Sequence, residues 1–249
     1  MMILNTLAEQ ISSNKVRVLW RNGTQMKGVL AITVNFSAAE KDIPVIAELI
    51  AIRYLVVEKK VFGSVPKGGS SIRLCVGSRE IPQLVKEQEN NAFAGRFAGF
   101  LAGRMAGIGI EVSDNREFMV TEEEIRGCEE TFILDEPGHY GERHEQVDTP
   151  AMGKVWVTAH AVQRYQERDT GANGETMKNP WSSFTKRIMN PDLQQTPLNA
   201  RARIHKLIAH GSETEVWCHP SDTLRFVLSI GTDGSKYLVT VFERDNSHW

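Results

Sequence analysis

One segment in the second half of the chain combines a titratable imidazole with two guanidinium groups. In VWVTAHAVQRYQERD, residues 155–169, His160, Arg164 and Arg168 recur at intervals of four. On an α-helix this spacing places the three side chains along one face. An imidazole titrates near neutral pH, and guanidinium groups are permanently charged anion binders. The pattern therefore indicates a site for a phosphodiester.

The neighbouring residues predict the helix that carries this stripe. Residues 155–157 form a short β-rich run, and Thr158 is placed as the N-cap because its hydroxyl can accept a backbone N–H of the first turn. Ala161, Val162 and Tyr165 point away from the stripe, so they are available for burial. The segment thus predicts a strand that turns directly into an amphipathic helix.

A structural role fits the same residues. A histidine at the start of a helix is often a half-buried packing residue, and Arg164 and Arg168 could pair with Glu167 and Asp169 on a solvated face. Clustered titratable groups indicate a functional site only as a tendency. Both interpretations stay open at the level of the sequence.

The composition favours an ordinary globular protein. The chain has 249 residues, 41% of them hydrophobic, and a formal net charge of −2, which argues against a uniformly basic nucleic-acid coat but allows a local basic site. Its three cysteines contain no CxxC pair, so we expect no disulfide framework or zinc finger and a reducing, cytoplasmic setting. The N-terminal residues lack the features of a secretory signal.

A glycine-rich segment imitates a membrane helix. Four glycines stand at a strict spacing of four: Gly95, Gly99, Gly103 and Gly107. Small residues at this spacing mark membrane helix dimers, but Arg96 and Arg104 interrupt the apolar run, and each would be costly in lipid. We therefore expect no membrane span. The prediction is a helix whose glycine ridge is buried against another element or forms a surface for self-association or a partner.

The order of expected elements predicts an α+β protein with two α/β-type domains. The polar segment 135–153, with Pro137 and Pro150, is predicted to be a linker between a domain at 1–134 and a domain at 154–249. The remaining elements follow from apolar patterns and turn signals. Strands are expected at 15–20, 26–36, 71–77, 109–112, 154–158, 213–219, 223–230 and 236–243, and helices at 43–59, 81–88, 159–168, 181–189 and 198–210.

The first half resembles the ribonuclease H-like fold, with a mixed sheet and helices. The run AELIAI, residues 47–52, looks like the family's helix that presents a metal-binding glutamate, here Glu48. VLWRNGT resembles its first strand with an Asp-Gly turn, and LCVGSREI resembles the later strand that ends in Asp-Ser. In that family, carboxylates at these places hold two divalent metal ions for phosphodiester hydrolysis.

The sequence departs from the ribonuclease H-like pattern at the carboxylates that would bind the metal ions. Asn22 stands where the first aspartate is expected, and Gly77 stands where the second is expected, while Asp114 is the candidate for a fourth ligand. Neutral residues cannot supply the negative charge that Mg²⁺ requires. The resemblance therefore implies a degenerate domain without a catalytic metal pair, acting as a scaffold or nucleic-acid reader.

The second half, residues 154–243, resembles the small metal-independent ribonuclease and toxin domains of the RelE and colicin type. The strand–helix run around His160, the later antiparallel strands and the ending YLVTVFERD carry this resemblance. It implies His160 as general acid or base, with Arg164 and Arg168 holding the phosphate. It further implies roles on the phosphate for Thr240 and Arg244, which share a strand face. His205 and His210 are second candidates for the opposite acid or base role.

These observations give one leading hypothesis and two alternatives. The leading hypothesis is an RNA-directed protein of a mobile element or defence system, possessing a metal-independent, toxin-like ribonuclease site and needing no cofactor. One alternative is a nucleic-acid-binding protein without cleavage, and the other is an interaction scaffold that uses the glycine ridge. The position of a second acid or base near His160 would distinguish them.

Overall fold

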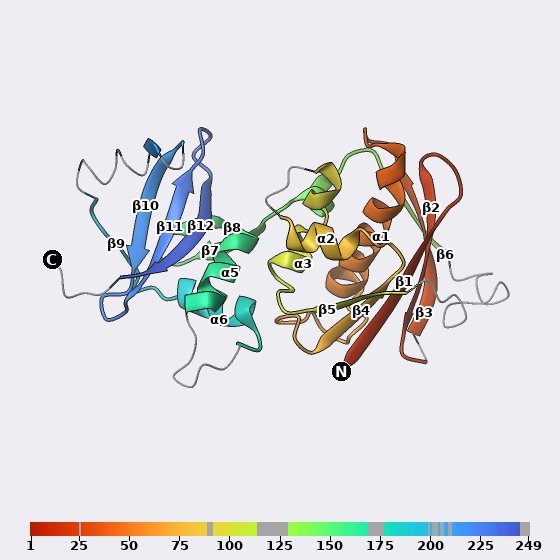
Figure 1. Cartoon of the computed structure of the whole chain (residues 1–249), viewed down its shortest axis with the longest axis horizontal. Coiled ribbons are helices and arrows are strands. Elements are labelled where there is room, and N and C mark those ends of the chain that lie inside the picture. The colour runs from red at the N-terminus through yellow and green to blue at the C-terminus, as the bar shows by residue number, and fades with distance from the viewer. Residues whose placement is uncertain are drawn as a thin grey trace. The chain divides into compact units, whose positions relative to one another are not determined.

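The computed structural model divides the chain into two compact units, Met1–Arg143 and His144–Trp249, each with its own sheet (Figure 1). The fold class is α+β, as predicted. The residues described are 1–24, 26–88, 92–113, 129–168, 177–198, 200, 204, 207–208 and 211–244.

The first unit is built on a six-stranded mixed sheet with the order β5-β4-β1-β2-β3-β6. Its first three strands form an antiparallel meander, and β4, β5 and β6 add to its two sides in parallel pairing. The strands are β1 (Met2–Gln10), β2 (Lys15–Asn22), β3 (Met26–Val34), β4 (Ile72–Val76), β5 (Gly109–Val112) and β6 (Glu129–Leu134).

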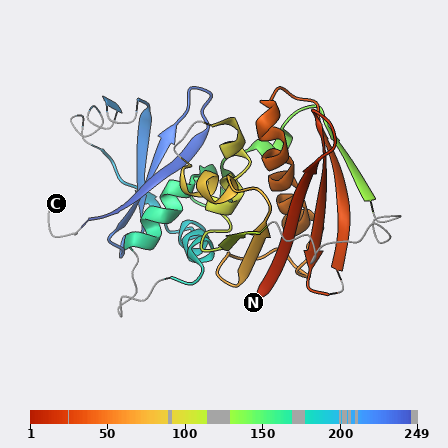
Figure 2. The same cartoon turned by 45° about the vertical axis from the view of Figure 1, so that its right-hand side comes forward.

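Helix α1 (Ile43–Arg53) covers the meander and continues into a π-helical turn, Tyr54–Glu58 (Figure 2). It is apolar on all sides because a further layer of short helices packs into the same core. That layer contains α2 (Ile81–Lys86), a 3₁₀ turn (Phe93–Arg96) and α3 (Gly99–Ala102).

The glycine segment differs from the single helix that its spacing predicts. The chain leaves helical geometry at Gly103 and adopts a left-handed conformation at Gly107, with φ of 86°. Glycine resists such departures least, so the four residues form no continuous ridge. Gly99 is nevertheless buried, and a Cβ there would lie 2.0 Å from the carbonyl oxygen of Arg143. Among the helices of the described residues, none is long and apolar enough to cross a membrane.

The second unit has a six-stranded sheet with the order β7-β8-β12-β11-β10-β9, in which β8 and β12 are parallel and the other pairs antiparallel. Its helices are α5 (Ala159–Arg168) and α6 (Pro180–Ile188). Its strands are β7 (Glu145–Thr149), β8 (Gly153–Val157), β9 (Gln194–Gln195), β10 (Glu213–Cys218), β11 (Leu224–Ile230) and β12 (Lys236–Glu243).

Three aromatic rings join the helices of this unit to its sheet. Tyr165 of α5 contacts Phe184 of α6 with ring centroids 5.3 Å apart, and Phe184 contacts Phe226 of β11 at 6.0 Å. Edge-to-face pairs at these separations stabilise a core beyond the area they bury. The helices α5 and α6 lie side by side (Figure 1).

The segment 135–153 is more ordered than the linker that its polarity predicts. It contains a 3₁₀ turn, Gly138–Gly141, and strand β7, which pairs with β8 from Glu145↔Val157 to Thr149↔Gly153. β7 is an edge strand. Edge strands of native proteins tolerate charged and polar residues, so this segment carries no apolar periodicity that would predict a strand.

Candidate nucleic-acid interface

The junction between β8 and α5 is fixed by the side chain of Thr158. Its hydroxyl accepts the backbone N–H of Ala161 at 3.1 Å and donates to the carbonyl oxygen of Leu238 on β12 at 2.9 Å. The backbone N–H of Thr158 donates to the same carbonyl at 3.2 Å. Thr158 is therefore the N-cap, as predicted, and it also joins the start of α5 to β12.

Helix α5 presents the expected polar stripe opposite an apolar face. Ala161, Val162 and Tyr165 are buried against the sheet. His160 and Arg164 are half-buried, and Arg168 is exposed at the last turn. The backbone thus projects one imidazole and two guanidinium groups from three successive turns.

All three stripe residues line one pocket of about 460 Å³, together with four consecutive residues of β12. The strand residues are Val239, Thr240, Val241 and Phe242. Consecutive residues of a strand point to opposite faces of its sheet. A pocket that touches four in a row therefore reaches the edge of the strand as well as one face.

That edge is open because β8 is short. The pairing of β8 with β12 covers only Lys236, Tyr237 and Leu238, whereas β11 accompanies β12 as far as Glu243. Over Val239–Glu243, no strand of the described residues pairs with β12 on its β8 side. The chain of β8 has by then turned into α5, which packs on β12.

The hydrogen-bond register identifies the peptide groups at this edge. The backbone N–H of Arg244 donates to the carbonyl of Thr223 at 3.0 Å. Thr223 and Arg244 continue the register of β11 and β12, so they form a hydrogen-bonded pair. Such pairs alternate along an antiparallel ladder. The peptide groups of Thr240 therefore face β11, and those of Val241 and Glu243 face the open edge. A bulge between Val227 and Leu228 precedes this stretch on β11.

Arg164 contacts His160 of the stripe and Glu167 beside it. Its Nε–H is directed at His160 Nε2 at 3.4 Å. Its other end pairs with Glu167 at 2.9 Å. This hydrogen bond lowers the pKa of Glu167 below its ordinary value. Both side chains of the pair are 43% exposed, and such ion pairs are weak and screened by salt.

The remaining predicted site residues are distributed unevenly. Thr240 lines the pocket with His160, Arg164 and Arg168, whereas Arg244 is exposed beyond the end of β12 and is not among the lining residues. His205 lies outside the described residues. Among the lining residues, His160 carries the one imidazole.

In the first unit, the glutamate singled out by sequence is fully buried. Glu48 accepts hydrogen bonds from the hydroxyl of Thr6 at 2.7 Å and from the backbone N–H of Gly77 at 2.7 Å. Ser78 adds its N–H at 2.9 Å and its hydroxyl. Burial raises the pKa of Glu48, although each of these hydrogen bonds acts in the opposite direction.

The assignment of Asn22 to the first aspartate position is corrected by this geometry. Asn22 ends β2 and donates to the carbonyl of Val61, away from Glu48. The residue that meets Glu48 from the neighbouring strand is Thr6, in the middle of β1. Strand β1 was not among the expected strands, so the contact between Thr6 and Glu48 was not predicted. Asp114 lies outside the described residues, and the part of the chain that is described holds no group of three or more potential metal ligands.

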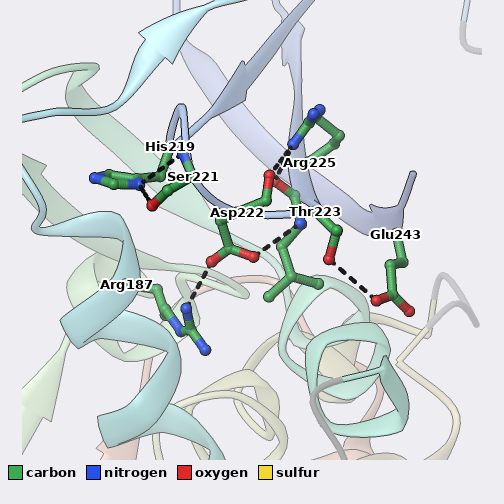
Figure 3. Close-up of polar contacts among 8 residues, drawn as sticks. Arg187, His219, Ser221, Asp222, Thr223, Arg225 and Glu243 are labelled. Carbon is green, nitrogen blue, oxygen red and sulfur yellow. Dashed lines mark hydrogen bonds and ion pairs between the residues drawn. The ribbon is translucent and has the colours of Figure 1, made fainter. Parts of the chain in front are cut away.

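The turn between β10 and β11 holds a second polar cluster (Figure 3). Asp222 pairs with Arg187 of α6 at 2.6 Å and accepts the N–H of Leu224 at 3.1 Å. The hydroxyl of Ser221 lies 2.8 Å from His219 Nδ1. These groups satisfy one another and tie the turn to α6, beside a cavity of about 390 Å³.

Comparisons with protein-family models, with curated proteins and with solved structures found no match to this chain.

Proposed function

We propose that the second unit binds RNA through its phosphate groups, at the pocket between α5 and β12. The observation that carries this proposal is the convergence of His160, Arg164, Arg168 and Thr240 on one pocket. Guanidinium groups bind phosphate oxygens through charge-assisted hydrogen bonds. The threonine hydroxyl adds a donor, and the imidazole adds a donor or an acceptor.

Binding is favoured over cleavage by what lines the pocket. Cleavage through attack of the ribose 2′-hydroxyl needs one group to accept a proton and one to return it. Of the lining residues, His160 carries the one imidazole, the side chain that most often performs such proton transfers. Metal-independent cleavage, with His160 in both roles, is therefore the second candidate function.

The proposed relation to the RelE and colicin type rests on the order of elements. A strand, two helices and an antiparallel set of strands follow one another from β8 to β12. This order supports the resemblance drawn from the sequence. A toxin-like role in a mobile element or defence system is part of the same proposal, as is a cytoplasmic setting, which accords with the free thiols of Cys75 and Cys218.

For the first unit, we propose a ribonuclease H-like scaffold without metal-dependent catalysis. The sheet order β3-β2-β1-β4-β5 supports this proposal, with a meander first and helix α1 between β3 and β4. The carboxylate of Glu48 already accepts four internal hydrogen bonds and is closed off from solvent. A hard divalent cation needs several free oxygen ligands, so this site is better suited to holding β1 and β4 together.

The test is RNA binding and cleavage by the purified full-length protein in EDTA. We expect fluorescence anisotropy to detect binding that Arg168→Ala weakens, because one phosphate contact is lost. Lys186→Ala is the matched control, since it removes an exposed positive charge from α6 outside the pocket. Equal affinity in Arg168→Ala and wild type would refute the site.

The same samples decide between the two candidates. RNA that stays intact over hours while bound supports the binding module. EDTA-resistant cleavage that His160→Ala abolishes would favour the ribonuclease. Cleavage that persists in His160→Ala would be traced to another site or to a contaminant.

A further inference from the structure

We infer that the pocket binds an extended single strand of RNA, with successive phosphates stepping along α5 and a base stacked on Phe242. This inference rests on the proposed RNA-binding function and specifies the form of the ligand. It derives from three features of the pocket: the spacing of His160, Arg164 and Arg168, the open strand edge, and a phenylalanine among the lining residues.

The three side chains of the stripe form a ladder along α5, with one side chain on each of three successive turns. Residues four apart on a helix are separated by about 6 Å along its axis. His160, Arg164 and Arg168 therefore form three steps along α5, and all three line the pocket with β12, where two strand residues span a similar distance of about 6.6 Å. Successive phosphates of an extended strand repeat at a comparable interval. A compact anion would use one step, whereas an extended backbone uses all three.

The wall of the pocket that β12 forms supplies both hydrogen-bond donors and hydrogen-bond acceptors. The peptide N–H and C=O of Val241 face the open edge, next to the hydroxyl of Thr240. A ribose 2′-hydroxyl can both donate and accept, so it can satisfy such an edge. Deoxyribose lacks this group.

Phe242 provides a surface for a base. It is half-buried and lies at the end of the four-residue strand wall. Aromatic side chains next to a basic groove are the usual platform for single-stranded nucleic acids, since every base has a π face. In a duplex the bases are already stacked and paired, and the deep major groove of A-form RNA closes them to side chains.

The ion pair between Arg164 and Glu167 is compatible with this mode. Both side chains are exposed, so exchanging the carboxylate for a phosphate requires no buried rearrangement. The middle step of the ladder is then available when RNA binds.

The experiment measures anisotropy of labelled oligouridines of two to eight nucleotides, an eight-base-pair RNA duplex, an eight-nucleotide abasic strand and an octaglutamate peptide. We expect affinity to rise steeply to about four nucleotides and then to level off, and the duplex to bind at least tenfold more weakly. Phe242→Leu should weaken the eight-nucleotide strand on the order of tenfold and leave the abasic strand unchanged. For the wild-type protein, the abasic strand should bind on the order of tenfold more weakly than the base-bearing one.

The salt dependence of RNA affinity gives an independent measure of how many phosphates the ladder contacts. Each phosphate contact on a single strand contributes about 0.7 to the slope of log affinity against log salt. Arg168→Ala should lower the slope by about that amount, and Lys186→Ala should leave it unchanged.

The outcomes separate this inference from the function on which it rests. A duplex that binds as tightly as the single strand, with the same dependence on Arg168, overturns the extended single strand and leaves RNA binding standing. Failure of every RNA to bind overturns both. Binding of octaglutamate in place of RNA would show that the open edge of β12 accepts a peptide strand, and would also overturn both.

Discussion

The hydroxyl of Thr158 donates to the carbonyl of Leu238 at 2.9 Å, and this bond lies where the pairing of β8 with β12 ends. Because the same hydroxyl caps α5 through Ala161, one side chain sets the distance between the helix and the strand. The stripe of α5 and the open edge of β12 face the same pocket as a consequence. The geometry of the candidate site therefore depends on a residue that does not line it.

Thr158→Ala is expected to lower the free energy of unfolding of the second unit by about 1 kcal/mol, within the range for a lost N-cap. RNA affinity should fall as well, because the start of α5 is no longer joined to β12. Thr158→Ser keeps the hydroxyl and should retain most of both. Urea denaturation and anisotropy on the same samples provide the measurements, and an alanine variant with wild-type values in both would contradict this account of the junction.

Glu167→Gln should strengthen RNA binding several-fold. The carboxylate of Glu167 pairs with Arg164 at 2.9 Å and competes with phosphate for the same guanidinium. Asp192→Asn is the control, since it also removes one exposed negative charge from this unit, away from the pocket. A similar gain in both variants would mean that net charge alone governs the affinity.

Stability of the first unit should depend on pH through Glu48. Burial raises the pKa of this carboxyl above its ordinary value of 4.5, so the folded state binds more protons than the unfolded state between 4.5 and the raised value. Stability attributable to Glu48 must then fall as pH rises through that window. Glu48→Gln lacks the titration.

The measurement is hydrogen exchange of the α1 amides in the wild type and in Glu48→Gln, at evenly spaced pH values from about 4 to about 8. The wild type should lose protection relative to Glu48→Gln as pH rises above 4.5. If the wild type instead gains relative protection, the four hydrogen bonds outweigh burial and the pKa is lowered.

Most elements of the second unit could be predicted because local signals and tertiary contacts agree there. The β-rich run before Thr158, the N-cap and the buried positions Ala161, Val162 and Tyr165 all indicate the same strand and helix. The spacing of the stripe then follows from helical geometry. Its convergence with Thr240 depends on the parallel pairing of β8 with β12, which connects distant parts of the chain and has no local signature.

The first unit was harder to predict because its first strand contains a buried polar residue. Thr6 of β1 is buried and donates a hydrogen bond to Glu48, so the strand lacks a regular apolar alternation. Without β1, the role of the first strand was assigned to the segment that ends at Asn22. Gly77 contacts Glu48 through its backbone N–H, which no side-chain pattern can indicate.

Gly99→Ala should destabilise the first unit, although alanine favours a helix. The added Cβ would lie 2.0 Å from the carbonyl oxygen of Arg143 and 2.6 Å from its carbonyl carbon, so backbone must move. Overpacking of this kind costs about 1–3 kcal/mol or more, against a gain in helix propensity of about 1 kcal/mol. Gly109→Ala is the matched control, because its Cβ would meet other atoms only at 3.8 Å and beyond.

Thermal unfolding and the oligomeric state, measured on both variants, distinguish the two roles considered for this glycine. We expect Gly99→Ala to melt at a lower temperature than Gly109→Ala, with the oligomeric state unchanged, because the crowded partner atom belongs to the same unit. A changed oligomeric state at an unchanged melting temperature would instead mean that Gly99 faces a second chain. The contact with Arg143 would then not explain why residue 99 is a glycine.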